Sequence, residues 1–160
     1  MTPTHKRCQA LFLCAIVLGC AAAGLPQDGV VRRVIDGDTI ELRGGRLVRY
    51  IGIDAPEVRR RAGEEWVEDP EPFGLEAKDA NRRWVEGRSV RLEYDVQTHD
   101  RYGRLLAYVF VEERMVNAAL LAEGYAQLLT IPPNVKYAEL FRRLVQEARA
   151  ARRGLWGALK

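Results

Sequence analysis

The chain has 160 residues and a formal net charge of +3, and its composition has no signature of disorder, collagen or a coiled coil. This length suits one domain with a substantial hydrophobic core. The small net charge makes a general electrostatic attraction to polyanions weak, so binding of that kind requires local clusters of basic side chains.

The first 19 residues have the layout of a secretory signal peptide. The basic stretch His5-Lys6-Arg7 precedes an apolar run at residues 10–19, which at about 10 residues is too short to span a bilayer. A buried N-terminal helix is the alternative, but it fits this order of segments less well. Two cleavage sites compete: Val17-Leu18-Gly19-Cys20 resembles a bacterial lipobox, and Ala21-Ala22-Ala23 resembles an ordinary signal peptidase site. We favour the first, which would place a lipid on Cys20.

The sequence therefore predicts an exported protein, either lipid-anchored in the bacterial cell envelope or secreted after cleavage between residues 23 and 24. Without residues 1–19 the chain keeps 23 basic and 22 acidic residues, and Cys20 is its only cysteine. An internal disulfide and a cysteine-based zinc site are thereby excluded. We expect residues 20–28 to form a linker and residues 29–157 to form the folded domain.

Three strands open the predicted domain. Residues 29–35 are a β-branched run, Asp36-Gly37 is a hairpin signal, and residues 39–43 return as the second strand. After a second glycine turn, residues 46–53 form the third strand. The pattern predicts a three-stranded meander with charged turns at its ends.

Residues 58–72 are charged, lack periodicity and contain two prolines, which is typical of a mobile surface loop. The run Arg59-Arg60-Arg61 within it has two interpretations, a contact with a polyanion or a solvated loop. Exposed charge runs are common in loops, which favours the second interpretation.

A helix follows this segment. Phe73, Ala77, Ala80 and Trp84 fall on one helical face, and Gly87 stands where a C-terminal cap belongs.

Two more strands and two more helices complete the chain. Residues 90–94 alternate between apolar and polar, whereas residues 105–111 are apolar on both faces and should be buried on both. The second helix covers residues 115–123, and the third carries an apolar face from Tyr137 to Ala151 and is ended by Gly154. This order predicts an α+β fold, a five-stranded OB-fold β-barrel with three helices.

The two acidic turns of the meander offer oxygen ligands for a metal ion. The carboxylates of Asp38 and Asp54 suit a hard cation, calcium or magnesium, and the backbone carbonyl of Ala55 can add a third oxygen. We expect Asp36 to orient the site rather than touch the ion, because two aspartates across so tight a turn rarely reach one ion. Taken alone, most such turns are simple hairpins.

Two arginines and a glutamate lie near these turns. Strict strand alternation places Arg49 on the face opposite Asp54, so a shared site requires an irregularity near Gly52 or at the strand end. Arg49 and Arg104 are always charged and can bind a phosphoryl group bidentately. Glu57 can accept a proton from water. Each residue alone fits a surface role, but together they predict phosphodiester hydrolysis.

Five ordered motifs over about residues 30–157 resemble the thermonuclease, or staphylococcal nuclease-like, family. The matching segments are VIDGDT at 34–39, RYIGIDAPE at 49–57, FGLEA at 73–77, DRYGRLLAY at 100–108, and VN at 116–117 with GYA at 124–126. The resemblance implies an OB barrel that acts as a calcium-dependent endonuclease. Such enzymes cleave single-stranded or frayed DNA and RNA and leave 3′-phosphate ends.

The resemblance also implies roles for individual residues. The calcium ligands would be Asp38, Asp54 and the carbonyl of Ala55, the catalytic residues Arg49, Glu57 and Arg104, and the substrate contacts Arg101 and Tyr102. Two positions depart from the family pattern: Ala55 replaces a frequent threonine, and Thr130 stands near a substrate-stacking tyrosine of some members.

Three hypotheses follow: a monomeric exported nuclease, a non-catalytic OB-fold module that binds nucleic acid or protein, and a sugar- or protein-binding envelope module. A non-catalytic module would be expected to lose the metal-binding aspartates and the site arginines. All of them are present, so the sequence favours the enzyme. The third hypothesis draws on fold alone.

Overall fold

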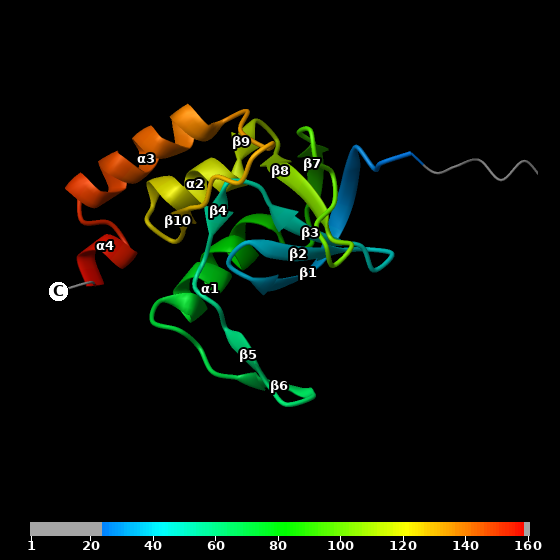
Figure 1. Cartoon of the computed structure of the whole chain (residues 1–160), viewed down its shortest axis with the longest axis horizontal. Coiled ribbons are helices and arrows are strands. Elements are labelled where there is room, and N and C mark those ends of the chain that lie inside the picture. Colours follow the sequence, from blue (N-terminus) through cyan, green and yellow to red (C-terminus); the bar gives the residue numbers. More distant parts are fainter. Residues whose placement is uncertain (1–23, 159–160) are drawn as a thin grey trace, which may run out of the picture.

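A computed structural model describes residues 24–158, so the predicted signal peptide and both cleavage sites lie outside the described residues. The chain forms a closed five-stranded barrel with helices packed around it (Figure 1). The barrel strands are β1 (Asp28–Asp36), β2 (Thr39–Leu42), β3 (Leu47–Tyr50), β7 (Ser89–Glu93) and β8 (Leu105–Val111). No helix within residues 24–158 is both long and apolar enough to cross a membrane.

The sheet closes because β8 pairs on both of its edges. It runs antiparallel to β7 and parallel to β3, while β1 joins β2 to β7 through two antiparallel pairings. Six of the seven residues of β8 are buried, as its two-sided apolar pattern predicts. The α+β, five-stranded OB arrangement expected from the sequence is confirmed.

Helix α1 (Gly74–Val85) contacts β1, while α2 (Val116–Ala122) packs against both β8 and α3 (Ala138–Ala150). Figure 1 shows α2 and α3 together on one side of the barrel, and α2 also contacts α1. The prediction that Gly154 ends the third helix is wrong, because the helix stops at Ala150 and a further short helix, α4 (Leu155–Ala158), follows.

The predicted third strand, residues 46–53, is split. It ends as β3 at Tyr50, turns at Ile51-Gly52, and resumes as β4 (Ile53–Asp54), which leaves the barrel and pairs with β10 (Gln127–Leu128). Gly52 has φ 83°, and an added Cβ would lie 2.5 Å from Cε2 of Phe141. A glycine therefore permits both the left-handed turn and the close approach of α3.

The prediction that residues 58–72 form a loop is wrong. They contain a two-stranded hairpin, β5 (Arg59–Ala62) and β6 (Glu65–Glu68), joined by a turn at Gly63-Glu64. This hairpin has no apolar alternation because neither face packs on the core, so it lacks the sequence signal by which half-buried strands are recognised. A two-residue strand, β9 (Arg114–Met115), completes the large sheet beside β8.

Candidate active site

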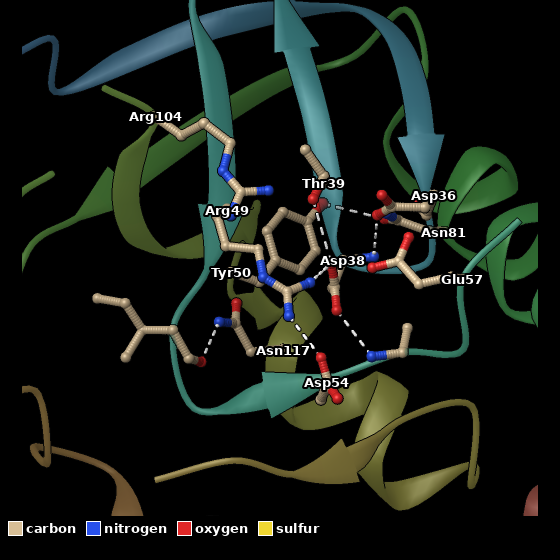
Figure 2. A network of polar contacts seen from close by, with 12 residues as sticks. Asp36, Asp38, Thr39, Arg49, Tyr50, Asp54, Glu57, Asn81, Arg104 and Asn117 are labelled. Carbon is tan, nitrogen blue, oxygen red and sulfur yellow. Dashed lines mark hydrogen bonds and ion pairs between the residues drawn. The ribbon is translucent and has the colours of Figure 1, made fainter. Parts of the chain in front are cut away.

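Strand pairing brings the predicted site residues to one end of the barrel. Arg49 on β3 lies opposite Thr39 on β2 and opposite Leu106 on β8. Asp38 immediately precedes Thr39, and Arg104 lies two residues before Leu106, so both flank Arg49 from neighbouring strands (Figure 2). The break after β3 then returns Asp54 toward the same place, which strict alternation along one strand would not allow.

Arg49 bridges two carboxylates. Its Nη1 forms an ion pair with Oδ1 of Asp38, and its Nη2 donates a hydrogen bond of 2.6 Å to Oδ1 of Asp54. The Asp38 side chain is only 1% exposed, whereas that of Asp54 is 55% exposed. Asp38 is thus a fixed internal anchor, and Asp54 faces the solvent from which a substrate or ion would arrive.

Asp38 also ties the first turn to the segment after β4. Its Oδ2 accepts a hydrogen bond of 2.7 Å from the backbone N–H of Ala55, and its Oδ1 accepts one of 3.1 Å from the hydroxyl of Thr39. The neighbouring Gly37 makes this approach possible, because an added Cβ there would lie 2.5 Å from Cβ of Ala55 and 3.0 Å from Cβ of Ala77.

Asp36 lies behind this pair. Its Oδ1 accepts the backbone N–H of Asp38 at 3.1 Å, which is a local cap of the tight turn. Burial raises the pKa of Asp36, and the charges of Arg49 and Arg104 only partly offset this rise. Both guanidinium groups thus favour the ionised form of this carboxyl group, and Figure 2 places Arg104 beside Arg49.

Glu57 lies between β4 and the β5–β6 hairpin. Its backbone N–H donates to Oε2 of Glu71 at 3.1 Å, and its carbonyl accepts the N–H of Glu71 at 2.8 Å. Figure 2 shows the Glu57 carboxyl group turned toward Asp36 and Asp38. Partial burial and the negative charge of Asp36 raise the pKa of Glu57, which makes its carboxylate a stronger base than an exposed glutamate.

Arg104 is held by the turn that carries it. Asp100 accepts a hydrogen bond of 2.6 Å from Nε of Arg104, and its other oxygen accepts the backbone N–H groups of Arg104 and Tyr102 at 3.0 and 2.9 Å. Partial burial would raise the pKa of Asp100, but these hydrogen bonds outweigh it and hold the pKa below its usual value. Asp100 therefore stays ionised and orients the guanidinium.

Arg101 and Tyr102 lie on this turn but outside the ion-pair network. Nη2 of Arg101 donates to the hydroxyl of Tyr102 at 2.6 Å, and the guanidinium lies 4.8 Å from the ring centroid. The Tyr102 side chain is largely exposed, so it is free to contact a bound molecule. Thr130, the position noted for a missing tyrosine, follows β10 and is also exposed.

The side-chain and backbone oxygens at this end of the barrel are donors of the type that hard cations prefer. Within residues 24–158 there is no group of three or more His, Cys, Asp or Glu side chains arranged to hold a metal ion. The available donors are instead two carboxylates, Asp38 and Asp54, with the carbonyl of Ala55, an all-oxygen set that suits calcium. Arg49 bridges Asp38 and Asp54, so both carboxylates reach one positively charged centre.

Two supporting residues, Asn81 and Asn117, have roles that were not predicted from the sequence. Asn81 donates to the carbonyl of Asp36 at 3.3 Å and accepts the hydroxyl of Tyr50 at 3.0 Å. Asn117 accepts the N–H of Val109 at 2.9 Å and donates to the carbonyl of Ile51 at 2.9 Å, directly at the strand break. The available signal was an asparagine within an apolar helical face, because a buried amide must find partners.

The comparisons with known proteins agree with this geometry. A family model described as "Staphylococcal nuclease homologue" matches residues 47–158. The chain is 40% identical to the "Thermonuclease" of Staphylococcus hyicus over 79% of this chain and 73% of the relative, and 38% identical to the "Thermonuclease" of Staphylococcus intermedius over 79% and 74%. It is also 37% identical to "Endonuclease YncB" of Bacillus subtilis (strain 168), over 78% of this chain and 59% of the relative. With this barrel, this strand break and these identities, the chain belongs to the staphylococcal nuclease family.

Proposed function

We propose that this protein is a calcium-dependent endonuclease that hydrolyses phosphodiester bonds of DNA and RNA and leaves 3′-phosphate ends. The observation that carries the proposal is the bridge from Arg49 to Asp38 and Asp54, at the barrel end where Glu57 and Arg104 also lie. The relatives named thermonuclease and endonuclease support the nuclease class.

In this proposal the arginines bind and polarise the phosphodiester. Guanidinium groups from β3 and from the turn before β8 approach from two strands, so each can donate to phosphate oxygens as negative charge develops on them. Asp100 keeps Arg104 in place through the 2.6 Å hydrogen bond, which limits the reorganisation needed during the reaction.

Glu57 accepts a proton from the attacking water. The water oxygen forms a new bond to phosphorus, the bond from phosphorus to the 5′-oxygen breaks, and the departing 5′-oxygen takes up a proton, so the phosphate stays on the 3′ side. Asp38, Asp54 and the carbonyl of Ala55 would hold calcium, which supplies positive charge to the phosphate oxygens when bound. Asp36 does not bind the ion in this proposal. Its carboxylate accepts the backbone N–H of Asp38 and so supports the turn that carries Asp38.

Cleavage of heat-denatured DNA and of RNA by purified residues 24–160, with calcium and with EGTA, tests this proposal. We expect cleavage with calcium and none with EGTA, and products that a DNA polymerase cannot extend because their 3′ ends carry phosphate. Full activity in EGTA would exclude calcium, and extendable ends would exclude the stated bond cleavage. Binding without any cleavage would instead support the non-catalytic OB module.

We further propose that the protein is exported, and that a lipid on Cys20 anchors it to the cell envelope. The support is the order of basic, apolar and small residues at positions 5–23. Mass spectrometry of the mature N-terminus tests the anchor: a diacylglyceryl group on Cys20 is expected, and a free terminus at Gly24 would show secretion without an anchor.

A further inference from the structure

The β5–β6 hairpin is an exposed feature that the proposed catalytic site does not use. Figure 1 shows it projecting from the barrel, away from the other strands. Every residue from Arg60 to Trp66 is exposed, and the Trp66 side chain is 64% exposed. Isolated two-stranded hairpins are marginal in water, and Trp66 does not belong to the hydrophobic core or to the residues packed against it.

Strand register sorts the hairpin's arginines onto two faces. Arg61 lies opposite Trp66, Arg59 lies opposite Glu68, and Arg60 lies opposite Val67. Because side chains alternate along a strand, Arg59, Arg61 and the acidic Glu68 share the face of Trp66, whereas Arg60 lies on the other face. Arg60 is ion-paired with Asp69, while Arg59 and Arg61 form no ion pair with any residue in the described part of the chain.

The base of the hairpin is fixed to the candidate active site. Glu57 and Glu71 exchange the two hydrogen bonds described above, and the N–H of Asp69 donates to the carbonyl of Val58 at 3.2 Å. Val58 itself is buried, which anchors the first strand where it leaves the barrel. The hairpin therefore begins two residues after Glu57, beside the candidate active site.

We propose that the Trp66 face of this hairpin binds the single-stranded nucleic acid that extends beyond the scissile bond, with a base stacked on Trp66 and phosphates paired with Arg59 and Arg61. An exposed indole beside two guanidinium groups, of which Arg61 donates only to the carbonyl of Gly63 at 3.2 Å, matches the alternation of planar bases and anionic phosphates. This inference rests on the proposed function, because it places the hairpin on the path of the nuclease substrate.

Fluorescence anisotropy with labelled oligothymidylates tests the binding, using the Glu57→Gln variant in EGTA so that no cleavage occurs. We expect Trp66→Ala to weaken binding of an oligonucleotide of about 15 nucleotides by roughly 5- to 160-fold. The affinity for an oligonucleotide of about 3 nucleotides should stay unchanged. Trp66→Phe should retain most of the affinity. Equal affinities of Trp66→Ala and its parent for the longer oligonucleotide would overturn the proposal.

Salt dependence provides a matched control. The double substitution Arg59→Gln with Arg61→Gln should reduce the slope of log K against log salt by about 1.4, because each phosphate contact on a single strand contributes about 0.7. Arg60→Gln removes one charge from the opposite face and should leave the slope unchanged. Equal effects per removed charge from the two faces would show only a general charge effect and would overturn the assignment.

Cleavage assays separate this inference from the proposed function. Here Trp66→Ala is the only substitution, and Glu57 is retained. The variant should have a higher KM for long denatured DNA, whereas both its kcat and its KM for a dinucleotide substrate should equal those of the wild type. A loss of kcat on the dinucleotide would show that the hairpin acts by positioning Glu57, and would overturn the inference while the nuclease stands. Oligonucleotide binding through Trp66 without any cleavage would retain the inference and reject the nuclease.

Binding of a different partner to the Trp66 face would also overturn the proposal. Anionic phospholipid vesicles that bind the wild-type protein but not Trp66→Ala, with oligonucleotide binding unchanged, would assign the face to a membrane. A dimer in sedimentation analysis that dissociates on the same substitution would assign it to a second copy of the chain.

Discussion

Replacing Gly52 by alanine should destabilise the protein by about 2–5 kcal/mol. The backbone at Gly52 has φ 83°, where a non-glycine residue costs roughly 1–2 kcal/mol. The new Cβ would lie 2.5 and 2.6 Å from two ring atoms of Phe141, so the ring must move by about 1 Å to reach normal contact. Phe141 is buried, and overpacking of this kind typically adds about 1–3 kcal/mol.

Gly87→Ala is the matched control, since Gly87 has φ 75° but an added Cβ there has nothing within 4 Å. It should show the backbone cost alone. Urea unfolding monitored by circular dichroism measures both variants, and Phe141→Leu completes a double-mutant cycle with Gly52→Ala that isolates the clash. Equal losses for the two glycine variants, with no coupling to Phe141, would refute the view that α3 packs against the strand break.

Three further predictions concern the site and its supports. Glu57→Gln and Arg104→Ala should each reduce hydrolysis of denatured DNA by orders of magnitude with urea midpoints near wild type, and wild-type turnover would remove the residue from the mechanism. Asn117→Ala should cost about 2–4 kcal/mol in urea unfolding, because it orphans the buried N–H of Val109; a loss below about 1 kcal/mol would contradict this role. The free energy of unfolding should fall as the pH drops below about 4, because hydrogen bonds outweigh burial and lower the pKa of Asp95 in the folded state. Asp95→Asn should therefore make the free energy of unfolding depend less on pH in this range.

The sign of the pH effect follows from the folded state. The carboxylate of Asp95 accepts hydrogen bonds from the backbone N–H of Lys136 at 3.0 Å and the hydroxyl of Tyr108 at 3.1 Å. Its stabilisation is complete above the pKa of an unfolded aspartate and is lost as the pH falls through the lower folded pKa. If the free energy of unfolding of Asp95→Asn falls at acid pH as steeply as that of the wild type, other carboxylates dominate acid unfolding.

Local pattern was sufficient for most of the barrel. The β-branched runs on either side of the Asp36-Gly37 turn predicted β1 and β2, and the run that is apolar on both faces predicted the buried strand β8. The predicted apolar face of α1 was also informative, because Ala77 and Ala80 are fully buried and Trp84 is half-buried. The ordered motifs also pointed to Asp38, Arg49, Asp54, Glu57 and Arg104, which lie at one barrel end.

Tertiary contacts decided what those patterns left open. The split at Gly52 depends on Phe141, almost ninety residues away, and the support of Asp36 by Asn81 joins the first hairpin to a helix. No window of sequence contains both partners of such contacts, so periodicity could not reveal them. The hairpin at residues 59–68 was missed for the opposite reason, because it packs on no core and leaves no apolar alternation. Sequence thus determined the elements and the chemistry of their side chains, while long-range packing determined the turn that brings Arg49 and Asp54 together.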